Sequence, residues 1–220
     1  MIIWLASYPK SGNTWVRHFL ASLIYSNQGK DGLDKLGFIM QYPKKDQFEK
    51  LVTDLNDFNQ IRKNWIRSQN IINSDNKIKI FKTHHSLCAL EEDNFTNEKN
   101  TLGAIYIVRD PRNVISSILY HFNLTNIEEA LNFLKDEKKF IDNLKNKINY
   151  PLLTLIGSWK SNYNSWKLIG KNFLLVKYED LILNPNNEFK RIANHIAKLI
   201  NVKFSEEQIK QSIEESSFKN

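Results

Sequence analysis

The chain has 220 residues, of which 41% are hydrophobic and 25% are charged, and its formal net charge is +7. This length and hydrophobic content are enough for one globular core, so we expect a single domain over residues 1–220. No apolar run approaches membrane-spanning length and no internal repeat is present, so we expect neither a transmembrane segment nor a repeat protein.

The N-terminus lacks the basic region and the long apolar region of a secretory signal, so we expect a cytoplasmic protein. The single cysteine, Cys88, excludes an intrachain disulfide and fits a reducing compartment. The Lys residues are scattered among Asn, Asp and Glu, so we expect no nucleic-acid partner. A modest positive charge suits a ligand that carries several negative charges.

Short apolar segments predict buried strands, and longer segments with helical periodicity lie between them. The predicted strands cover residues 2–6, 78–82, 104–108 and 173–177. The predicted helices include residues 47–58, 61–72, 111–121 and 151–169. Capping boxes are predicted at Thr125 with Glu128 and at Ser205 with Gln208. This alternation is typical of an α/β fold that has a parallel sheet with helices on both faces, whose ligands bind beyond the carboxyl ends of the strands.

The segment between the first strand and the next helix has the composition of a phosphate-binding loop. It reads Tyr8-Pro9-Lys10-Ser11-Gly12-Asn13-Thr14-Trp15. In a strand–loop–helix arrangement, backbone N–H groups and the helix N-terminus converge on an anion. Lys10 adds a positive charge, and its neighbours add short polar side chains. The loop differs from the nucleotide pattern G-x-x-x-x-G-K-[ST], because Lys10 comes two positions before Gly12.

The other predicted strands also end in polar or charged residues. The second leads into Lys82-Thr83-His84-His85, the third into Arg109-Asp110-Pro111 and a helix with Ser117, and the fourth into Tyr178-Glu179-Asp180-Leu181. Because these strand ends share one edge of a parallel sheet, they predict a polyanion site with a histidine available as base. His84 as a core histidine and Arg109 as a helix cap are the structural alternatives. No set of residues has metal-ligand spacing, so we expect no metal.

In this order, the motifs resemble those of the cytosolic-type sulfotransferases, which use 3′-phosphoadenosine 5′-phosphosulfate (PAPS) as sulfuryl donor. The resemblance runs from Tyr8 to Phe218 and covers essentially the whole chain. It implies the sulfotransferase fold, which is related to P-loop nucleotide kinases, with PAPS as co-substrate and no metal. The acceptor would be a hydroxyl or amine on a small molecule or glycan.

The resemblance also implies roles for individual residues. The donor-binding residues would be Lys10, Ser11, Gly12, Asn13, Thr14, Trp15, Arg109, Ser117, Tyr178, Ser216 and Phe218. Within this set, Arg109 and Ser117 would hold the 3′-phosphate, and Tyr178 would contact the adenine. Phe218 would stack on the adenine opposite Trp15. The catalytic residues would be His84 as general base, with Lys10 and Lys82 beside the transferring group.

Two features depart from the family pattern. His85 stands where the family often has Leu, which leaves two candidate bases. Neighbouring strand residues point to opposite faces, so only one can enter the cleft, and the alignment favours His84. The family also continues into a segment Arg-Lys-Gly-x-x-Gly-Asp-Trp that closes over the 3′-phosphate, and this sequence does not contain it. We expect that these residues belong to a longer chain; a true loss would put activity in doubt.

Two other functions stay open at this point. A kinase-like phosphotransferase would need a Lys directly after the loop glycine and an Asp that holds Mg²⁺, for which Asp110 is the nearest candidate. A non-catalytic PAPS- or nucleotide-binding protein would share the donor loop. The acceptor has no readable signature, and we expect its pocket in the loops at residues 27–45 and 86–100.

Overall fold

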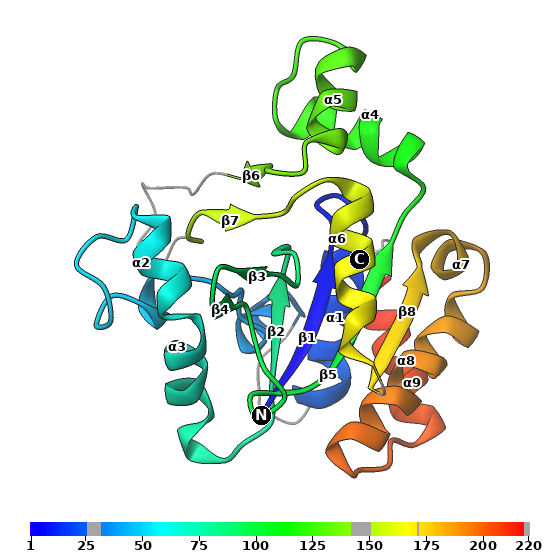
Figure 1. Cartoon of the computed structure of the whole chain (residues 1–220). Coiled ribbons are helices and arrows are strands. Elements are labelled where there is room, and N and C mark those ends of the chain that lie inside the picture. Colours follow the sequence, from blue (N-terminus) through cyan, green and yellow to red (C-terminus); the bar gives the residue numbers. More distant parts are fainter. Residues whose placement is uncertain (26–31, 142–150, 171, 218–220) are drawn as a thin grey trace.

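The computed structural model describes residues 1–25, 32–141, 151–170 and 172–217 (Figure 1). Its centre is a 4-stranded parallel sheet in the order β2–β1–β5–β8. The strands are β1 (Ile2–Ser7), β2 (Lys79–Thr83), β5 (Thr101–Val108) and β8 (Phe173–Lys177). The predicted strands are confirmed, although β5 begins at Thr101 rather than at residue 104. Because the strands are parallel, their carboxyl ends meet at one edge, which is the upper edge in Figure 1.

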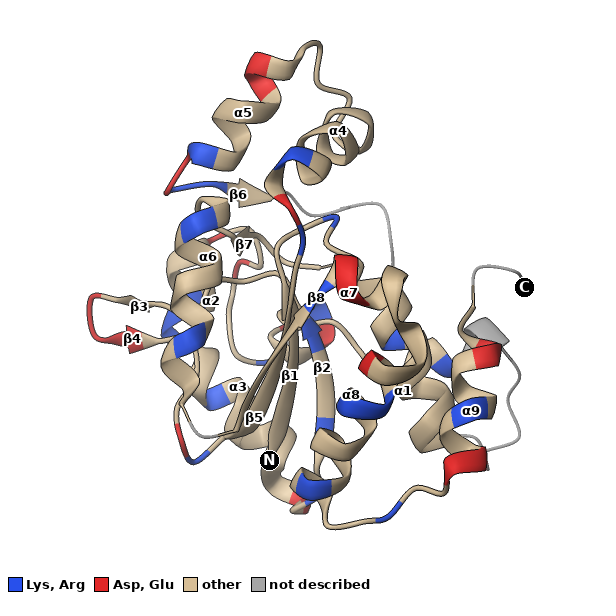
Figure 2. Ribbon diagram, turned by 90° about the vertical axis from the view of Figure 1, so that its right-hand side faces the viewer, with Lys and Arg blue, Asp and Glu red and all other residues tan. Residues whose placement is uncertain are grey.

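Helices cover both faces of the sheet because alternate strand residues are apolar on each side. Ile3 and Leu5 pack in one core with three helices, α1 (Asn13–Tyr25), α8 (Pro185–Ile200) and α9 (Glu206–Glu215). Ile2 and Trp4 pack in a second core on the opposite face, with α2 (Phe58–Lys63), α3 (Trp65–Ile72) and α6 (Trp159–Trp166). Figure 2 shows the sheet edge-on between these two layers. The predicted α/β class is confirmed.

A smaller third core supports a helical pair beyond the carboxyl edge of the sheet. α4 (Pro111–His121) and α5 (Ile127–Lys135) pack there on Tyr8, which belongs to the loop after β1. They form the projection at the top of Figure 1. The antiparallel pair β6 (Phe140–Ile141) and β7 (Thr154–Leu155) lies between this projection and the sheet.

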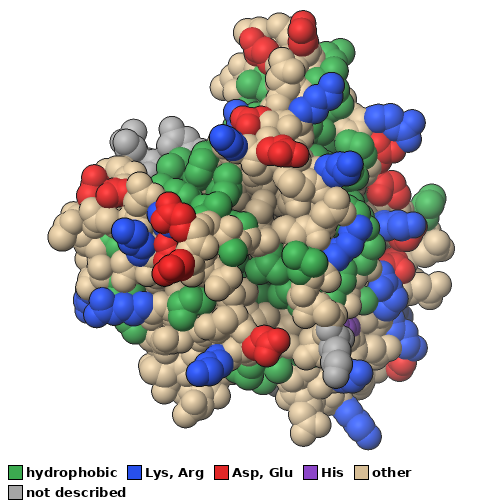
Figure 3. Space-filling view, viewed as in Figure 1, with side chains coloured by type: hydrophobic (Ala, Val, Ile, Leu, Met, Phe, Trp, Pro, Cys, Tyr) green, Lys and Arg blue, Asp and Glu red, His purple; other side chains and the backbone are tan. Residues whose placement is uncertain are grey.

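The remaining elements are short. They are α7 (Tyr178–Leu183), the pair β3 (Ala89–Leu90) and β4 (Asp93–Asn94), and the 3-10 helices η1 (Gly32–Phe38), η2 (Lys45–Gln47), η3 (Asn73–Asp75) and η4 (Lys167–Ile169). Within the described residues, no helix has both the length and the apolar character needed to cross a membrane. On the face in Figure 3, the described Lys and Arg side chains are interspersed with Asp and Glu.

Two local predictions agree closely with the structure. The helix predicted at 111–121 is confirmed as α4, and the capping box of Ser205 with Gln208 is present at the start of α9. The capping box predicted at Thr125 is wrong by one residue. Asn126 caps α5 instead, because its side-chain oxygen accepts from the backbone N–H of Glu129 at 3.0 Å.

The predicted helix at 47–58 is wrong, and the one at 61–72 is divided. Turns follow η2, and α2 begins only at Phe58, where the Asp57 carboxylate accepts from the backbone N–H groups of Asn59 and Gln60. The helical path then breaks at Asn64, whose φ of −109° separates α2 from α3.

The predicted helix at 151–169 is too long. Its first part pairs with β6 as strand β7, and α6 begins only at Trp159. Gly157 has a φ of +63°, which turns the chain before the helix. Ser158 then caps α6 by accepting from the backbone N–H of Ser161 at 3.0 Å.

Candidate active site at the carboxyl edge of the sheet

A cavity of about 710 Å³ opens at the carboxyl ends of the strands. Most of the predicted site residues line it: Lys10, Gly12, Asn13, Thr14, Trp15, Lys82, His84, Arg109, Ser117 and Tyr178. Ser11, in the same loop as Lys10 and Gly12, is buried and does not line the cavity. Ser216 ends α9 away from the lining, where its hydroxyl donates to the Ile213 carbonyl at 3.1 Å. Phe218 lies outside the described residues.

The loop from Tyr8 to Thr14, called the donor loop after the ligand that the resemblance implies, follows β1 and has a backbone shape suited to an anion. Lys10 and Gly12 have φ values of +66° and +94°, so the chain turns sharply twice before α1. A Cβ on Gly12 would lie 2.4 Å from Tyr178 Cδ2, so only glycine fits beside that ring. The Ser11 hydroxyl is 1% exposed and has no hydrogen-bond partner among the described residues. Ser11 does not line the cavity, whereas Lys10 and Thr14 of the same loop do.

His84 follows β2 and is held in one tautomer. Its Nδ1 lies 2.7 Å from the carbonyl oxygen of Ser7. A carbonyl can only accept a hydrogen bond, so Nδ1 carries the proton and Nε2 has the free electron pair. Burial, with the nearby charge of Lys82, holds the pKa of His84 well below its usual value. The imidazole is therefore neutral near neutral pH and can accept a proton through Nε2.

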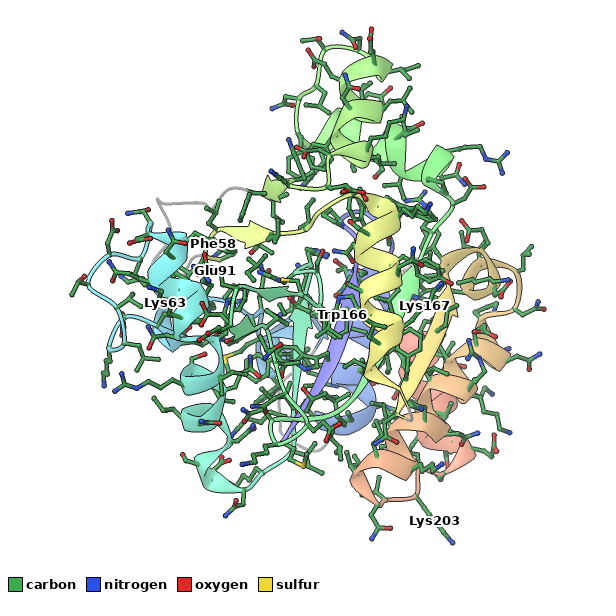
Figure 4. All side chains as sticks on the ribbon, in the orientation of Figure 1. Phe58, Lys63, Glu91, Trp166, Lys167 and Lys203 are labelled. Carbon is green, nitrogen blue, oxygen red and sulfur yellow. The ribbon has the colours of Figure 1, made fainter. Side chains whose placement is uncertain are left out.

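His85 lies on the opposite side of the strand end. It is fully buried, stacked on Phe95 at 4.3 Å, and its Nδ1 donates to the Ser86 carbonyl at 2.7 Å. Burial lowers its pKa to about 4. Trp166, which lies over the sheet in Figure 4, donates to the His85 carbonyl at 2.9 Å. Of the two imidazoles, only His84 lines the cavity.

Cationic side chains reach the cavity from three strands. Lys82 donates to the Gln41 side chain at 3.2 Å, and burial, with the charge of Arg17, lowers its pKa to about 8. Arg109 donates to the Lys10 carbonyl at 2.9 Å and lies 4.5 Å above the Tyr178 ring. No acidic side chain of the described residues lines this cavity. Such a lining favours an anionic ligand.

Asp110, the candidate Mg²⁺ ligand of a kinase, has a structural role instead. Its carboxylate caps α4 by accepting from the backbone N–H of Arg112 at 2.9 Å and also pairs with the Arg112 guanidinium. These contacts lower the pKa of Asp110 to about 2. In the part of the chain that the structure describes, no group of three or more His, Cys, Asp or Glu side chains could hold a metal ion.

The rest of the cavity could not be read from the sequence. Its lining is completed by Pro9, Gln41, His121, Phe122, Ile141, Pro151, Leu152 and Thr154. Of the described residues in the loops where we expected the acceptor pocket, Gln41 alone lines the cavity, and no residue of 86–100 contributes. Pro9 comes from the loop after β1, and the others come from the end of α4 and from the β6–β7 region. The sequence has no signal for this, because tertiary contacts bring these short segments together.

The chain matches the family described as the sulfotransferase domain over residues 2–220, and it belongs to that family. It is 24% identical to cytosolic sulfotransferase 7 of Arabidopsis thaliana over 96% of this chain and 60% of that protein. It is 23% identical to a 3-beta-hydroxysteroid sulfotransferase of Cavia porcellus over 97% of this chain and 63% of that protein. The chain thus spans less than two thirds of these relatives.

The fold is also that of a solved sulfotransferase. A crystal structure of a mouse sulfotransferase complexed with PAP superposes with a TM-score of 0.56 at 21% identity, covering 99% of this chain and 65% of that one. The sulfotransferase fold expected from the motifs is therefore confirmed.

Proposed function

We propose that this chain transfers a sulfuryl group from PAPS to a small-molecule acceptor. The observation that carries the proposal is a neutral histidine, His84, whose Nε2 is free to accept a proton in a cavity that also holds Lys10, Lys82 and Arg109. Membership of the sulfotransferase family supports it. So does the fold shared with a mouse sulfotransferase complexed with PAP.

The described residues fit such a donor. Lys10, Lys82 and Arg109 supply positive charge to the cavity, and no acidic side chain of the described residues lines it. The donor loop from Lys10 to Thr14 would hold the 5′-phosphosulfate, and Arg109 with Ser117 the 3′-phosphate. The resemblance assigns Trp15 and Tyr178 to the adenine, and both line the cavity, where their rings lie edge to face at 6.3 Å. The contact of Ser216 with the donor and the stacking of Phe218 on the adenine stay predictions.

Bound PAPS would supply the sulfuryl group, and this chain's residues would manage protons and charge. His84 Nε2 would accept the proton of the acceptor hydroxyl or amine, while Nδ1–H stays on the Ser7 carbonyl. The ammonium groups of Lys10 and Lys82 would stabilise negative charge that develops at the transferring group. The loop and Arg109 would align the two substrates, which removes much of the entropic cost of bringing them together.

The names of relatives indicate the acceptor class. The Cavia porcellus relative is named for a hydroxysteroid, and a Flaveria bidentis relative for a flavonol. Both compounds are small molecules with hydroxyl groups. We therefore propose a hydroxyl-bearing small molecule as acceptor. We also propose a cytoplasmic location, because the Arabidopsis thaliana relative is named as a cytosolic sulfotransferase.

A transfer screen tests the proposed function. The chain is incubated with radiolabelled PAPS and pooled phenols, alcohols, amines and glycans, with and without EDTA. We expect label on a small hydroxyl compound at a rate that EDTA does not change. Transfer from ATP that requires Mg²⁺ would instead support a kinase. PAPS binding without transfer to any pool would support a binding protein.

A further inference from the structure

A buried hydrogen-bonded chain connects the donor loop to the candidate base. The Asn13 side-chain nitrogen donates to the Ser7 hydroxyl at 3.1 Å, and that hydroxyl lies 3.3 Å from Nδ1 of His84. Ser7 and Asn13 are 0% and 5% exposed. We propose that Asn13 is a positioning residue which, through Ser7, keeps His84 in its base-competent tautomer. The effect of Asn13 on the tautomer does not depend on the proposed function, but its effect on catalysis rests on that function.

The contacts of Asn13 fix the orientation of its amide. Its side-chain nitrogen also donates to the Leu5 carbonyl at 3.2 Å. A carbonyl accepts only, so the NH₂ group must face β1, and both of its N–H donors are used there. The amide oxygen is buried and has no partner among the described residues. Because both N–H donors are used on β1 and the oxygen can only accept, the side chain has no donor left for a phosphate, so Asn13 is suited to hold β1 rather than to bind the donor by its side chain.

The position of Ser7 explains why the tautomer needs support. Nδ1 of His84 lies near two oxygens of Ser7, the carbonyl at 2.7 Å and the hydroxyl at 3.3 Å. The carbonyl requires a proton on Nδ1. The hydroxyl could donate to Nδ1 instead, which would place the imidazole proton on Nε2 and remove the base. The hydroxyl keeps its own proton when it accepts from Asn13, so the effect of Asn13 is on position: its hydrogen bond holds the Ser7 side chain in the rotamer that leaves the oxygen 3.3 Å from Nδ1. At that distance the hydroxyl is the weaker partner, and the carbonyl at 2.7 Å determines the tautomer.

This arrangement also connects the base to the donor loop. Asn13 is the first residue of α1 and directly follows Gly12, whose φ of +94° shapes the loop. A shift of the loop would move the amide and release the Ser7 hydroxyl. The tautomer of His84 would then depend on whether the loop is held in place.

The test reads the tautomer directly by two-bond ¹H–¹⁵N spectra of protein labelled with ¹⁵N-histidine, near neutral pH and without ligands. We expect the native chain to show His84 protonated on Nδ1 alone. Asn13→Ala, or the milder Asn13→Ser, should show a mixture of tautomers. The double variant Ser7→Ala/Asn13→Ala should return to one tautomer, because the competing hydroxyl is gone while the Ser7 carbonyl remains.

Asn100→Ala is the matched control. Asn100 is 2% exposed, its side chain donates to Asn70 at 2.8 Å, and it lies beside the N-terminal end of β1. This variant should keep a single His84 tautomer. A mixture in this control, or one tautomer in both Asn13 variants, would overturn the inference.

Kinetics give a second readout. We expect Asn13→Ala to lower kcat for transfer about tenfold, part of the 10²–10⁴-fold that a general base contributes. The stabilisation by 3′,5′-bisphosphoadenosine should be kept. Loss of that stabilisation with an unchanged tautomer would make Asn13 a donor ligand and refute the inference. If the native chain transfers no sulfuryl group, the proposed function fails, but the spectra still decide the role of Asn13.

Discussion

The pH dependence of the free energy of unfolding tests whether His85 is buried as a neutral imidazole. His85 is fully buried and stacked on Phe95, and its pKa falls from 6.5 in the unfolded chain to about 4 in the fold. The folded-state pKa is the lower one, so protons bind the unfolded chain more tightly. The contribution of His85 to the free energy of unfolding is therefore fully present above its pKa in the unfolded chain. It is lost as the pH falls from there towards about 4.

The size of the effect follows from these two pKa values. At about pH 5, His85 is mostly protonated in the unfolded chain and mostly neutral in the folded chain. The linkage relation then gives a loss of about 2 kcal/mol between about pH 7 and pH 5. His85→Leu removes this titration and keeps an apolar side chain of suitable size. The variant should lose about 2 kcal/mol less than the native chain over the same interval.

Urea unfolding at both pH values measures the difference. Groups that titrate in both proteins, His84 among them, cancel when the two pH dependences are compared. Loss of the hydrogen bond from His85 to the Ser86 carbonyl changes stability at both pH values and cancels in the same way. Equal losses in the native chain and in His85→Leu would refute the burial of a neutral His85.

Two further predictions concern the donor loop. Gly12→Ala places a Cβ 2.4 Å from the Tyr178 ring at a φ of +94°, so chemical denaturation should show a loss of about 1–3 kcal/mol; unchanged stability would contradict the packing of that ring on the loop. With 3′,5′-bisphosphoadenosine and no metal, the melting temperature of the native chain should rise by ligand linkage, and Lys10→Ala or Arg109→Ala should remove most of that shift while the ligand-free protein stays folded. A full shift in both variants would place the phosphates elsewhere.

The strands and the site edge could be predicted because they depend on local patterns. Apolar runs such as residues 104–108 predicted the strands, and parallel strands bring their ends together whatever the connections are. The helix at 111–121 was predictable for the same reason, since Asp110 and Pro111 give it a local start signal.

Other features depended on tertiary contacts that no local pattern encodes. Phe48 is apolar because it packs in the core beside Tyr42, but the residues that follow it form turns, so the helix predicted there is absent. Asn13 was read as a donor ligand from its place in the motif, whereas its hydrogen bonds to β1 appear only in the fold. The part of the cavity lining outside the strand ends comes from segments far apart in the sequence, at the end of α4 and in the β6–β7 region.

The central claim is that His84 is the general base for sulfuryl transfer. The most direct measurement compares transfer from radiolabelled PAPS by His84→Ala and His85→Ala, with donor binding monitored in both. We predict that His84→Ala binds the donor but loses transfer by about 10²–10⁴-fold, whereas His85→Ala keeps substantial activity. An active His84→Ala beside an inactive His85→Ala would show that the other imidazole is the base and would contradict the account.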